Sequence, residues 1–305
     1  MGNQNQPDVS LSGGREYQFE LRTNYYQDRS KLSALNRFMR TIFEFDFEEW
    51  VEKGFWDSQY VPFSFFQDNT IISNVSLYSM DMVVNGERRK VAQICTCGTL
   101  PEYRRRGFAG KLLQKALESA KQDHHFVFLL SNDDVVRFYR SHGFQPVKEF
   151  KVSVRAPRVE ALPGSVKLDP DNPENLDLIS TYAAARAPVS DHFGVLNTNL
   201  LIFHCLYGLR DNIYHIPDLD VIVLYKRQKR RLILYDVLGE RVPAFSKFYP
   251  YLADGRRETV EFLFVPDKMA LSRVRPRRHK GNNVHCLGGY PFSKQKVLVP
   301  YTARA

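Results

Sequence analysis

Three consecutive arginines and a group of small residues stand together in the stretch RRRGFAG, from Arg104 to Gly110. The segment before it, Gln93 to Thr99, is strand-like, and the segment after it has the apolar spacing of a helix. The stretch is therefore predicted to form the N-terminal end of a helix, where unpaired backbone N–H groups and the helix dipole favour an anion. Small residues let a phosphate approach the backbone closely, and the arginines add positive charge. The sequence thus predicts a phosphate-binding loop.

A second group with chemical potential follows a strand-like segment at Phe126 to Leu130. It reads NDDVVRFYRSHGF and contains Tyr139, whose phenol, with an ordinary pKa near 10, is protonated at neutral pH and can donate a proton. Asn132 comes just before the predicted helix, where it would be an ordinary N-cap. The competing interpretation of Tyr139 is a core aromatic residue like its neighbour Phe138.

Together these two segments resemble the signatures of the GCN5-related N-acetyltransferases (GNAT). Arg104 to Ala109 matches the family's acetyl-CoA signature, Q/R-x-x-G-x-G/A, and residues 138–144 match its second signature, with Phe-Tyr, a three-residue gap and Gly-Phe. The loop is neither a nucleotide P-loop, which needs Gly-Lys-Ser/Thr, nor a dinucleotide G-x-G-x-x-G loop. The resemblance covers roughly residues 15 to 155.

The resemblance implies a chemistry and a set of site residues. An acetyl group would move from the thioester of acetyl-CoA to an amine by direct attack, with Tyr139 as the general acid. The cofactor's phosphates would lie on the loop and its arm along the main chain of the preceding strand, and Asn132 would hydrogen-bond the cofactor. The cofactor-binding residues are thus predicted to be Cys97, Gly98, Thr99, Arg104, Arg105, Arg106, Gly107, Phe108, Ala109, Gly110 and Asn132.

The general base is left open by the sequence. Many members of the family place a carboxylate on the central strand, but Val91 to Thr99 contains neither Asp nor Glu. The remaining candidates are Glu44, Glu48, a chain of water molecules, and the carboxylate of Ala305 if the end of the chain returns to the site.

The acceptor is expected to bind near residues 27–52, because this helical region sets acceptor specificity in the family. Its run from Phe43 to Trp50, FEFDFEEW, could line an amine pocket or could form an amphipathic helix with a solvated acidic face. We expect a small-molecule amine rather than a protein as the acceptor. Small amines, aminoglycosides, polyamines, peptide N-termini and protein lysines remain candidates.

The predicted elements indicate an α+β (mixed α/β) fold, with a central, mostly antiparallel sheet flanked by helices. After a first strand at Tyr17 to Thr23, helices are predicted within residues 27–52, and strands at 60–67 and 71–84 lead through the turn Asn85-Gly86 into the strand before the loop. The second half repeats this order, with helices at 173–186, 197–206 and 243–252 and strands at 212–215, 221–226, 231–237 and 259–265.

The second half is therefore predicted to be a degenerate GNAT-like domain, similar to the arrangement of tandem Eis-type acetyltransferases. Its counterpart of the loop, Val237 to Pro243, lacks the glycines and arginines in the right places. The predicted division is a disordered polar tail at 1–14, a catalytic domain at 15–155, a Pro- and Gly-rich linker at 156–165 and the second domain at 166–305.

Composition narrows the class of protein. With 305 residues, 43% of them hydrophobic, the chain is long enough for two cored domains, and no apolar run approaches a membrane span. Neither a secretory signal pattern nor paired Cys and His spacings for a disulfide framework or a metal site are present, so we expect a cytoplasmic protein without a metal. The oligomeric state, including a homo-oligomer, stays open.

The positive charge of the second half raises a different class of function, the binding of nucleic acid. The chain has a net charge of +9. Residues 1–155 carry 21 Lys/Arg against 19 Asp/Glu, whereas residues 156–305 carry 22 against 15, so most of the positive charge lies in the second half. Two runs, 226–231 and 273–280, supply most of the excess, and such runs can bind nucleic acid. The first run lies between two strands and is more simply a solvated hairpin turn. Two alternatives to an acetyltransferase therefore remain: a CoA-binding module without catalysis, which the missing carboxylate on the central strand permits, and a nucleic-acid-associated protein, which the basic second half suggests.

Overall fold

A computed structural model describes residues 19–272, 274–279, 283–289 and 296–305 of the chain. The predicted tail at 1–14, the start of the first predicted strand at Tyr17 and part of the basic run at 273–280 lie outside the described residues. The chain divides into two compact units: the first comprises residues up to 79, 90–129 and 305, and the second residues 80–89 and 130–304. Each unit is described by itself.

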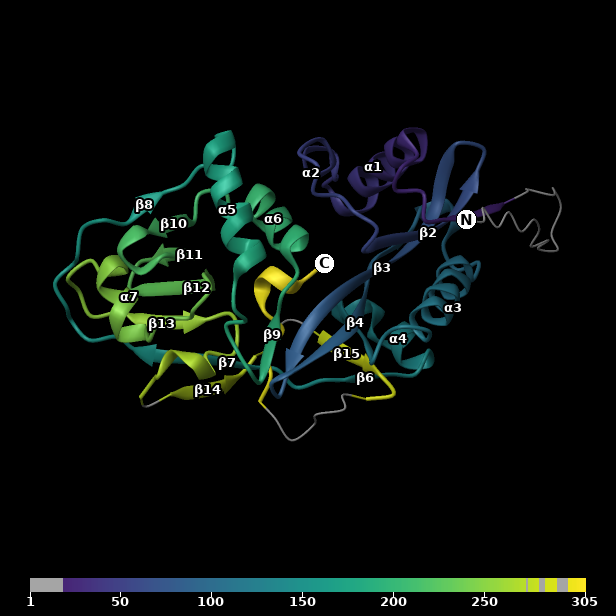
Figure 1. The fold of residues 1–305 in the computed structure, drawn as a ribbon. Helices are drawn as coiled ribbons and strands as arrows, with labels where there is room; N and C mark the ends of the chain where they lie inside the picture. The colour runs from purple at the N-terminus through teal and green to yellow at the C-terminus, as the bar shows by residue number, and fades with distance from the viewer. Residues whose placement is uncertain (1–18, 273, 280–282, 290–295) are drawn as a thin grey trace. The chain divides into compact units, whose positions relative to one another are not determined.

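The first unit is built on one sheet, whose strands follow the order β1-β2-β3-β4-β5 (Figure 1). The pairs β1/β2 and β2/β3 are antiparallel, whereas β4 and β5 are parallel. The connection between those two parallel strands contains the predicted loop and its helix. The bounds are β1 Glu20–Thr23, β2 Tyr60–Gln67, β3 Thr70–Val84, β4 Glu87–Thr99 and β5 Val127–Ser131, the ends of β3, β4 and β5 extending into the second unit.

Three helices pack on this sheet. Helix α1 (Arg29–Phe43) begins at Asp28, whose side chain caps the helix by accepting a hydrogen bond from the N–H of Lys31 over 3.1 Å. The short helix α2 (Glu48–Glu52) follows, and its Trp50 is 1% exposed. Helix α3 (Phe108–Ala120) buries a stripe of apolar residues at helical spacing, namely Phe108, Leu112, Leu113, Ala116 and Ala120. The apolar pattern in the sequence therefore predicted all three helices within a few residues.

The second unit contains a seven-stranded sheet in the order β14-β7-β13-β12-β11-β10-β8. Neighbouring strands are antiparallel except β12 and β13, which are parallel. The bounds are β7 Phe150–Arg155, β8 Val166–Lys167, β10 Ile213–Ile216, β11 Val221–Gln228, β12 Arg231–Leu238, β13 Thr259–Phe262 and β14 Arg275–Arg278. Two smaller pairings belong to the same unit: β6 (Phe144–Pro146) with β15 (Asn283–Leu287), and β9 (Phe193–Val195) with the end of β3.

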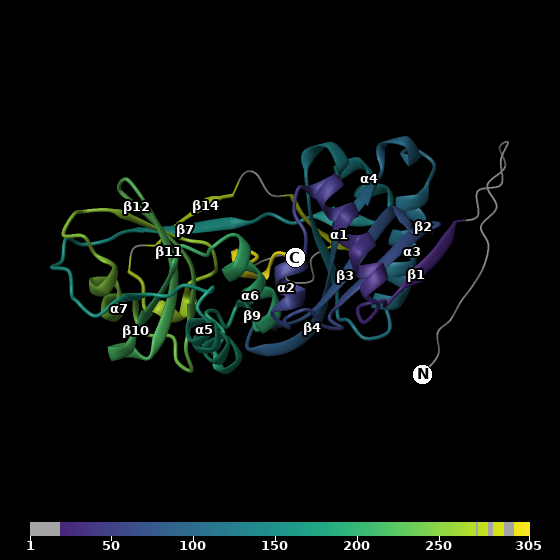
Figure 2. The same cartoon turned by 90° about the horizontal axis from the view of Figure 1, so that it is seen from above.

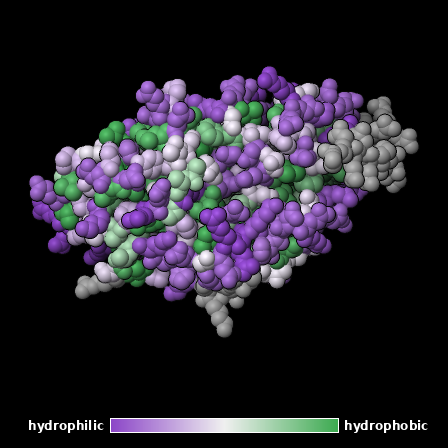
Figure 3. Space-filling model, viewed as in Figure 1, coloured by the Kyte–Doolittle hydropathy of each residue, from purple (hydrophilic) through white to green (hydrophobic). Residues whose placement is uncertain are grey.

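Helix α7 (Phe245–Leu252) packs its aromatic side chains into the core of this sheet, and α5 (Pro173–Ala185) and α6 (Thr198–Tyr207) pack on each other (Figures 1 and 2). Asn172 and Asn197 cap α5 and α6 by accepting hydrogen bonds from backbone N–H groups. Figure 3 shows hydrophilic residues over most of the visible surface of each unit, with hydrophobic patches between them. Within the part of the chain that the structure describes, no helix is long and apolar enough to cross a membrane.

The two sheets connect their strands and helices in the same order. In each, antiparallel strands (β2-β3-β4 and β10-β11-β12) are followed by a helix and then by a strand parallel to the last of them (β5 and β13). Both units thus combine sheets with flanking helices, which confirms the predicted mixed α/β fold. The predicted domain bounds, 15–155 and 166–305, stay a prediction.

Candidate active site

Gly107 forms the turn into α3. Its φ of +81° lies in the left-handed region, where a side chain is strained, and a Cβ built on it meets no atom of another described residue within 4 Å. The residue is exposed, so the N-terminal end of α3 faces open space. The first turn of α3 contains no acidic residue. The backbone at this position thus curves into an exposed helix N-terminus, where unpaired N–H groups favour an anion.

The three arginines of the loop are exposed and are not neutralised by a carboxylate in the described part of the chain. Arg105 has a φ of +62°, so two left-handed residues, 105 and 107, curve this backbone. Arg104 turns back to the strand, where its Nε donates a hydrogen bond to the carbonyl oxygen of Thr99 over 3.1 Å. Arg106 lies over the ring of Tyr103, 5.4 Å from its centroid. The loop and the end of β4 are thus joined directly.

Phe108 differs from its predicted neighbours in the loop. Its side chain is 3% exposed and packs on Phe19 and Phe65, with ring centroids 4.8 and 5.5 Å away. This side chain belongs to the core, so only its backbone remains available to a ligand. Ala109 and Gly110 are partly exposed in the first turn of α3.

The end of β4 extends beyond its parallel partner. Pairing with β5 covers Ala92 to Ile94, five residues before β4 ends at Thr99. Cys97, Gly98 and Thr99 are partly exposed and lie in this extension. In this segment β4 has passed the residues that pair with β5.

Thr96 marks an irregularity in β4 that the sequence did not signal. Its φ is +44°, which is an outlier for a β-branched residue. Polar side chains hold it there: Asn74 donates to its carbonyl oxygen over 2.9 Å, and its hydroxyl lies 2.6 Å from that of Tyr60. Strained backbone of this kind costs about 1–3 kcal/mol and concentrates at functional sites.

The packing of α1 on β4 explains why residue 98 is a glycine, apart from any role in binding. A Cβ at this position would lie 2.9 Å from Ile42 and 3.3 Å from both Phe38 and Phe43. Glycine therefore allows the C-terminal part of α1 to pack closely on the end of β4.

The side chain of Gln93 forms hydrogen bonds with Ala305, the last residue of the sequence. Its amide donates to an oxygen of Ala305 over 2.9 Å, and the N–H of Ala305 donates to its Oε1 over 3.2 Å. Gln93 is 1% exposed and lies on β4. The structure thus brings Ala305, one of the base candidates, to the strand that precedes the loop.

The other two carboxylate candidates differ in their surroundings. Glu48 forms an ion pair with Arg40, which also binds Asp46 over 2.6 Å. Although burial works in the opposite direction, hydrogen bonds from the Glu48 N–H and from Arg40 hold the pKa of Asp46 below its ordinary value. Glu44 is exposed and forms no ion pair with another described residue.

Tyr139 and Asn132 belong to the second unit. Tyr139 lies on α4 (Val136–Ser141), is 6% exposed and has the rings of Phe138 and Phe144 at 5.1 and 6.0 Å. Asn132 precedes a single 3-10 turn at Asp133–Val135, and its side chain forms no capping hydrogen bond there. Asn132 does occupy the expected N-cap position, but the capping bond that would explain it structurally is not formed.

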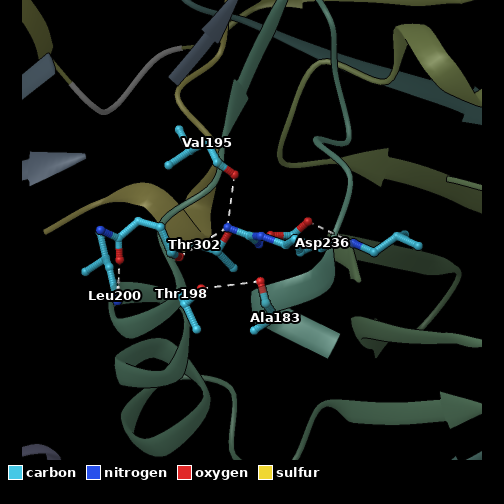
Figure 4. Close-up of polar contacts among 9 residues, drawn as sticks. Ala183, Val195, Thr198, Leu200, Asp236 and Thr302 are labelled. Carbon is cyan, nitrogen blue, oxygen red and sulfur yellow. Dashed lines mark hydrogen bonds and ion pairs between the residues drawn. The ribbon is translucent and has the colours of Figure 1, made fainter. Parts of the chain in front are cut away.

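In the second unit, other residues of the chain occupy the place that corresponds to the end of β4 beyond its pairing with β5. Pairing of β12 with β13 stops at Leu234, four residues before β12 ends. Beyond that point Asp236 accepts hydrogen bonds from Arg186 over 2.9 Å and from Thr302 over 2.6 Å (Figure 4). The N–H of Tyr301 donates to Leu263, just after β13. The short helix at Tyr301–Ala303 thus fills this place.

Gly239, in the counterpart of the phosphate loop, also differs from Gly107. A Cβ on it would lie 2.9 Å from both the carbonyl oxygen of Asp220 and the side chain of Val221. This glycine allows close packing, whereas Gly107 borders open space.

The basic run at 226–231 is partly neutralised. Arg227 forms ion pairs with Glu258 and Asp254, and Arg231 binds Glu261 over 2.5 Å. The run does span the turn between β11 and β12, as predicted. Among the described residues, no group of three or more His, Cys, Asp or Glu side chains could hold a metal ion.

Residues 28–147 match the family model described as the acetyltransferase (GNAT) domain. The chain carries a GNAT acetyltransferase domain. The match spans both predicted signatures and confirms the resemblance in the sequence, identifying residues 28–147 as an acetyltransferase domain. Members of the family use acetyl-CoA as the acetyl donor. No curated protein matches the sequence.

Solved structures with a similar fold extend the likeness beyond the matched domain. A conserved protein of Enterococcus faecalis V583, described as a probable N-acyltransferase, has a TM-score of 0.58 at 16% identity, covering 88% of this chain and 71% of that one. A GCN5-related N-acetyltransferase from Kribbella flavida reaches 0.54 at 17% identity, with the same coverage. Eis1 from Mycobacterium abscessus reaches 0.53 at 18% identity, covering 87% and 72%. The fold likeness therefore includes the second half of the GNAT protein.

Proposed function

We propose that this GNAT protein transfers the acetyl group of acetyl-CoA to a small-molecule amine and that its phosphate site is the loop from Arg104 to Gly110. The observation that carries the proposal is Gly107, whose left-handed backbone opens the N-terminal end of α3 to space that no protein atom occupies within 4 Å of its Cβ position. The unneutralised arginines beside it add the charge that a polyphosphate needs.

The extension of β4 supports the same assignment. Cys97, Gly98 and Thr99 continue past the pairing with β5, and the hydrogen bond from Arg104 to Thr99 ties this segment to the loop. Main-chain groups of the three residues would hold the cofactor's arm, and the cofactor supplies an acetyl thioester when bound. Asn132, exposed and without a capping bond, is assigned to the cofactor as well.

Two proton transfers complete the proposal. The hydroxyl of Tyr139 gives its proton to the leaving sulfur atom, and the amine must lose a proton to become nucleophilic. For that second step we favour the α-carboxylate of Ala305, in a protein that ends at this residue. Its hydrogen bonds to Gln93 support this choice, whereas Glu48 is already engaged by Arg40.

The experiment that tests the function measures the thermal midpoint with and without acetyl-CoA, followed by release of free thiol from acetyl-CoA with a panel of amines. A ligand present at one hundred times its dissociation constant adds about 2.7 kcal/mol to the stability of the folded state, which gives a clear upward shift. A shift together with thiol release supports the enzyme. A shift without turnover on any amine would indicate a CoA-binding module, and no shift would remove the loop from the proposal.

A further inference from the structure

Aromatic side chains form a continuous cluster between the end of α1 and the end of β4 in the first unit. Ring centroids are 6.2 Å apart for Phe43 and Phe45, 5.2 Å for Phe45 and Phe47, 5.0 Å for Phe47 and Trp56, and 4.6 Å for Trp56 and Tyr60. Phe47 and Tyr60 are buried, whereas the other three are partly exposed. We call this set the aromatic cluster.

The aromatic cluster contacts β4 where that strand has passed its pairing with β5. The hydroxyl of Tyr60 lies 2.6 Å from that of Thr96, and the ring of Phe43 lies 3.3 Å from the Cβ position of Gly98. Gly98 is one of the three β4 residues along which the proposed function places the cofactor's arm, and Thr96 lies two positions before it in the same strand. A molecule that reacts there would meet the exposed rings of the cluster.

The carboxylates next to the aromatic cluster are mostly paired. Asp46 and Glu48 both bind Arg40, and Glu49 lies 3.8 Å from Lys53. Residues 40–57 nevertheless carry six carboxylates against Arg40 and Lys53, so the local charge attracts an ammonium group.

Glu44 forms no ion pair with another described residue. It stands between Phe43 and Phe45, is exposed, and ends α1 in the left-handed region with a φ of +61°, where Gly or Asn is preferred. The C-terminal end of a helix carries partial negative charge, which adds to that of the carboxylate. An exposed glutamate at this strained position, next to two partly exposed aromatic residues in the sequence, can attract an ammonium group.

From these observations we propose that the acceptor is an amine attached to an aromatic body, with its ring on Phe43, Phe45 and Trp56 and its ammonium group at Glu44 before deprotonation. The proposal rests on the proposed acetyl transfer and names the substrate class of the same site. Aromatic pairing contributes about tenfold in affinity for a well-placed ring pair.

The test compares kcat/KM for 2-phenylethylamine, n-butylamine and spermidine at saturating acetyl-CoA. The expected result is a preference of about tenfold for 2-phenylethylamine over both others. Phe45→Ala should remove that preference by raising the KM for 2-phenylethylamine alone. Phe126→Ala is the matched control, because Phe126 is also partly exposed in the first unit but lies at the start of β5, beside Ala92.

Glu44→Asn separates a binding role from a structural one. Asparagine tolerates the left-handed region better than glutamate, so the variant should be at least as stable as the parent protein. Its KM for 2-phenylethylamine should nevertheless rise about tenfold, whereas its KM for acetyl-CoA should not change.

The outcomes distinguish this inference from the function on which it rests. Thiol release that is fastest with spermidine, or a Phe45→Ala variant that loses activity equally on all three amines, would overturn the aromatic acceptor and leave the acetyltransferase intact. Absence of both thiol release and a thermal shift with acetyl-CoA would overturn the proposed function and this inference with it.

Discussion

Gln93 and Ala305 exchange two hydrogen bonds, 2.9 Å and 3.2 Å long, although 212 positions separate them in the sequence. The contact brings residue 305 to β4, the strand that has no acidic residue of its own from Val91 to Thr99. We propose that, in a protein that ends at Ala305, the α-carboxylate held in this way replaces the absent acidic side chain as the general base.

Extending the protein beyond Ala305 tests that idea, because an added residue converts the carboxylate into an uncharged peptide group. Loss of a general base should lower kcat by about 100-fold or more, with the KM for acetyl-CoA unchanged. The measurement is steady-state thiol release by a protein with two residues appended to Ala305. A protein with the same two residues placed before Met1 is the control. Undiminished kcat in the extended protein would exclude Ala305 as the base.

Replacement of Gly107 by leucine should remove acetyl-CoA binding, because the new side chain would occupy space that a phosphate needs. Gly54→Leu is a close control: both glycines have a φ of +81° and no atom within 4 Å of the Cβ position, so the backbone strain should be equal. Isothermal titration with acetyl-CoA measures the difference. Equal affinities in the two variants would show that the loop does not hold the cofactor.

Tyr139→Phe should lower kcat by about 100-fold while the KM for acetyl-CoA stays within twofold, because only the proton donor is removed. The ring contacts with Phe138 and Phe144 do not need the hydroxyl, so the fold should tolerate the change. Tyr103→Phe, which removes a phenol hydroxyl that donates to Gln67 in the first unit, serves as the control. A fully active Tyr139→Phe variant would leave this residue as a core aromatic.

The local parts of the site could be predicted from the sequence. The loop from Arg104 to Gly110 depends on small residues and on an apolar stripe that lie next to each other in the chain, so its position at the start of α3 follows from spacing alone. The same holds for the strands around the turn at Asn85-Gly86.

The long-range parts could not be predicted in the same way. The pairs Arg186/Asp236 and Asp236/Thr302 are 50 and 66 positions apart, and periodicity carries no information on such contacts. One signal was available: Asp236 is the only charged residue in the apolar stretch LILYDVL, and a charge in a buried strand requires a partner. The left-handed Thr96 had no comparable signal, since threonine is an ordinary strand residue.

His204 makes the stability of the second unit depend on pH. Its Nε2 donates to the carbonyl oxygen of Arg304 over 2.9 Å, and burial is the main cause that lowers the pKa of His204 from 6.5 to about 4. The folded protein therefore binds this proton less readily than the unfolded chain. The contribution is fully present above pH 6.5 and is lost as the pH falls toward 4, which corresponds to about 2 kcal/mol of unfolding free energy at pH 5.

His204→Gln retains a donor for Arg304 but cannot be protonated, so its free energy of unfolding should fall by about 2 kcal/mol less than that of the parent between pH 7 and pH 5. Urea unfolding at the two pH values measures this difference. The exposed His125, replaced in the same way, controls for the loss of a histidine as such. Some dependence on pH should remain in the His204 variant, since burial also lowers the pKa of His279 to about 4. An equal fall in the parent and in His204→Gln would mean that this histidine is not the group that titrates.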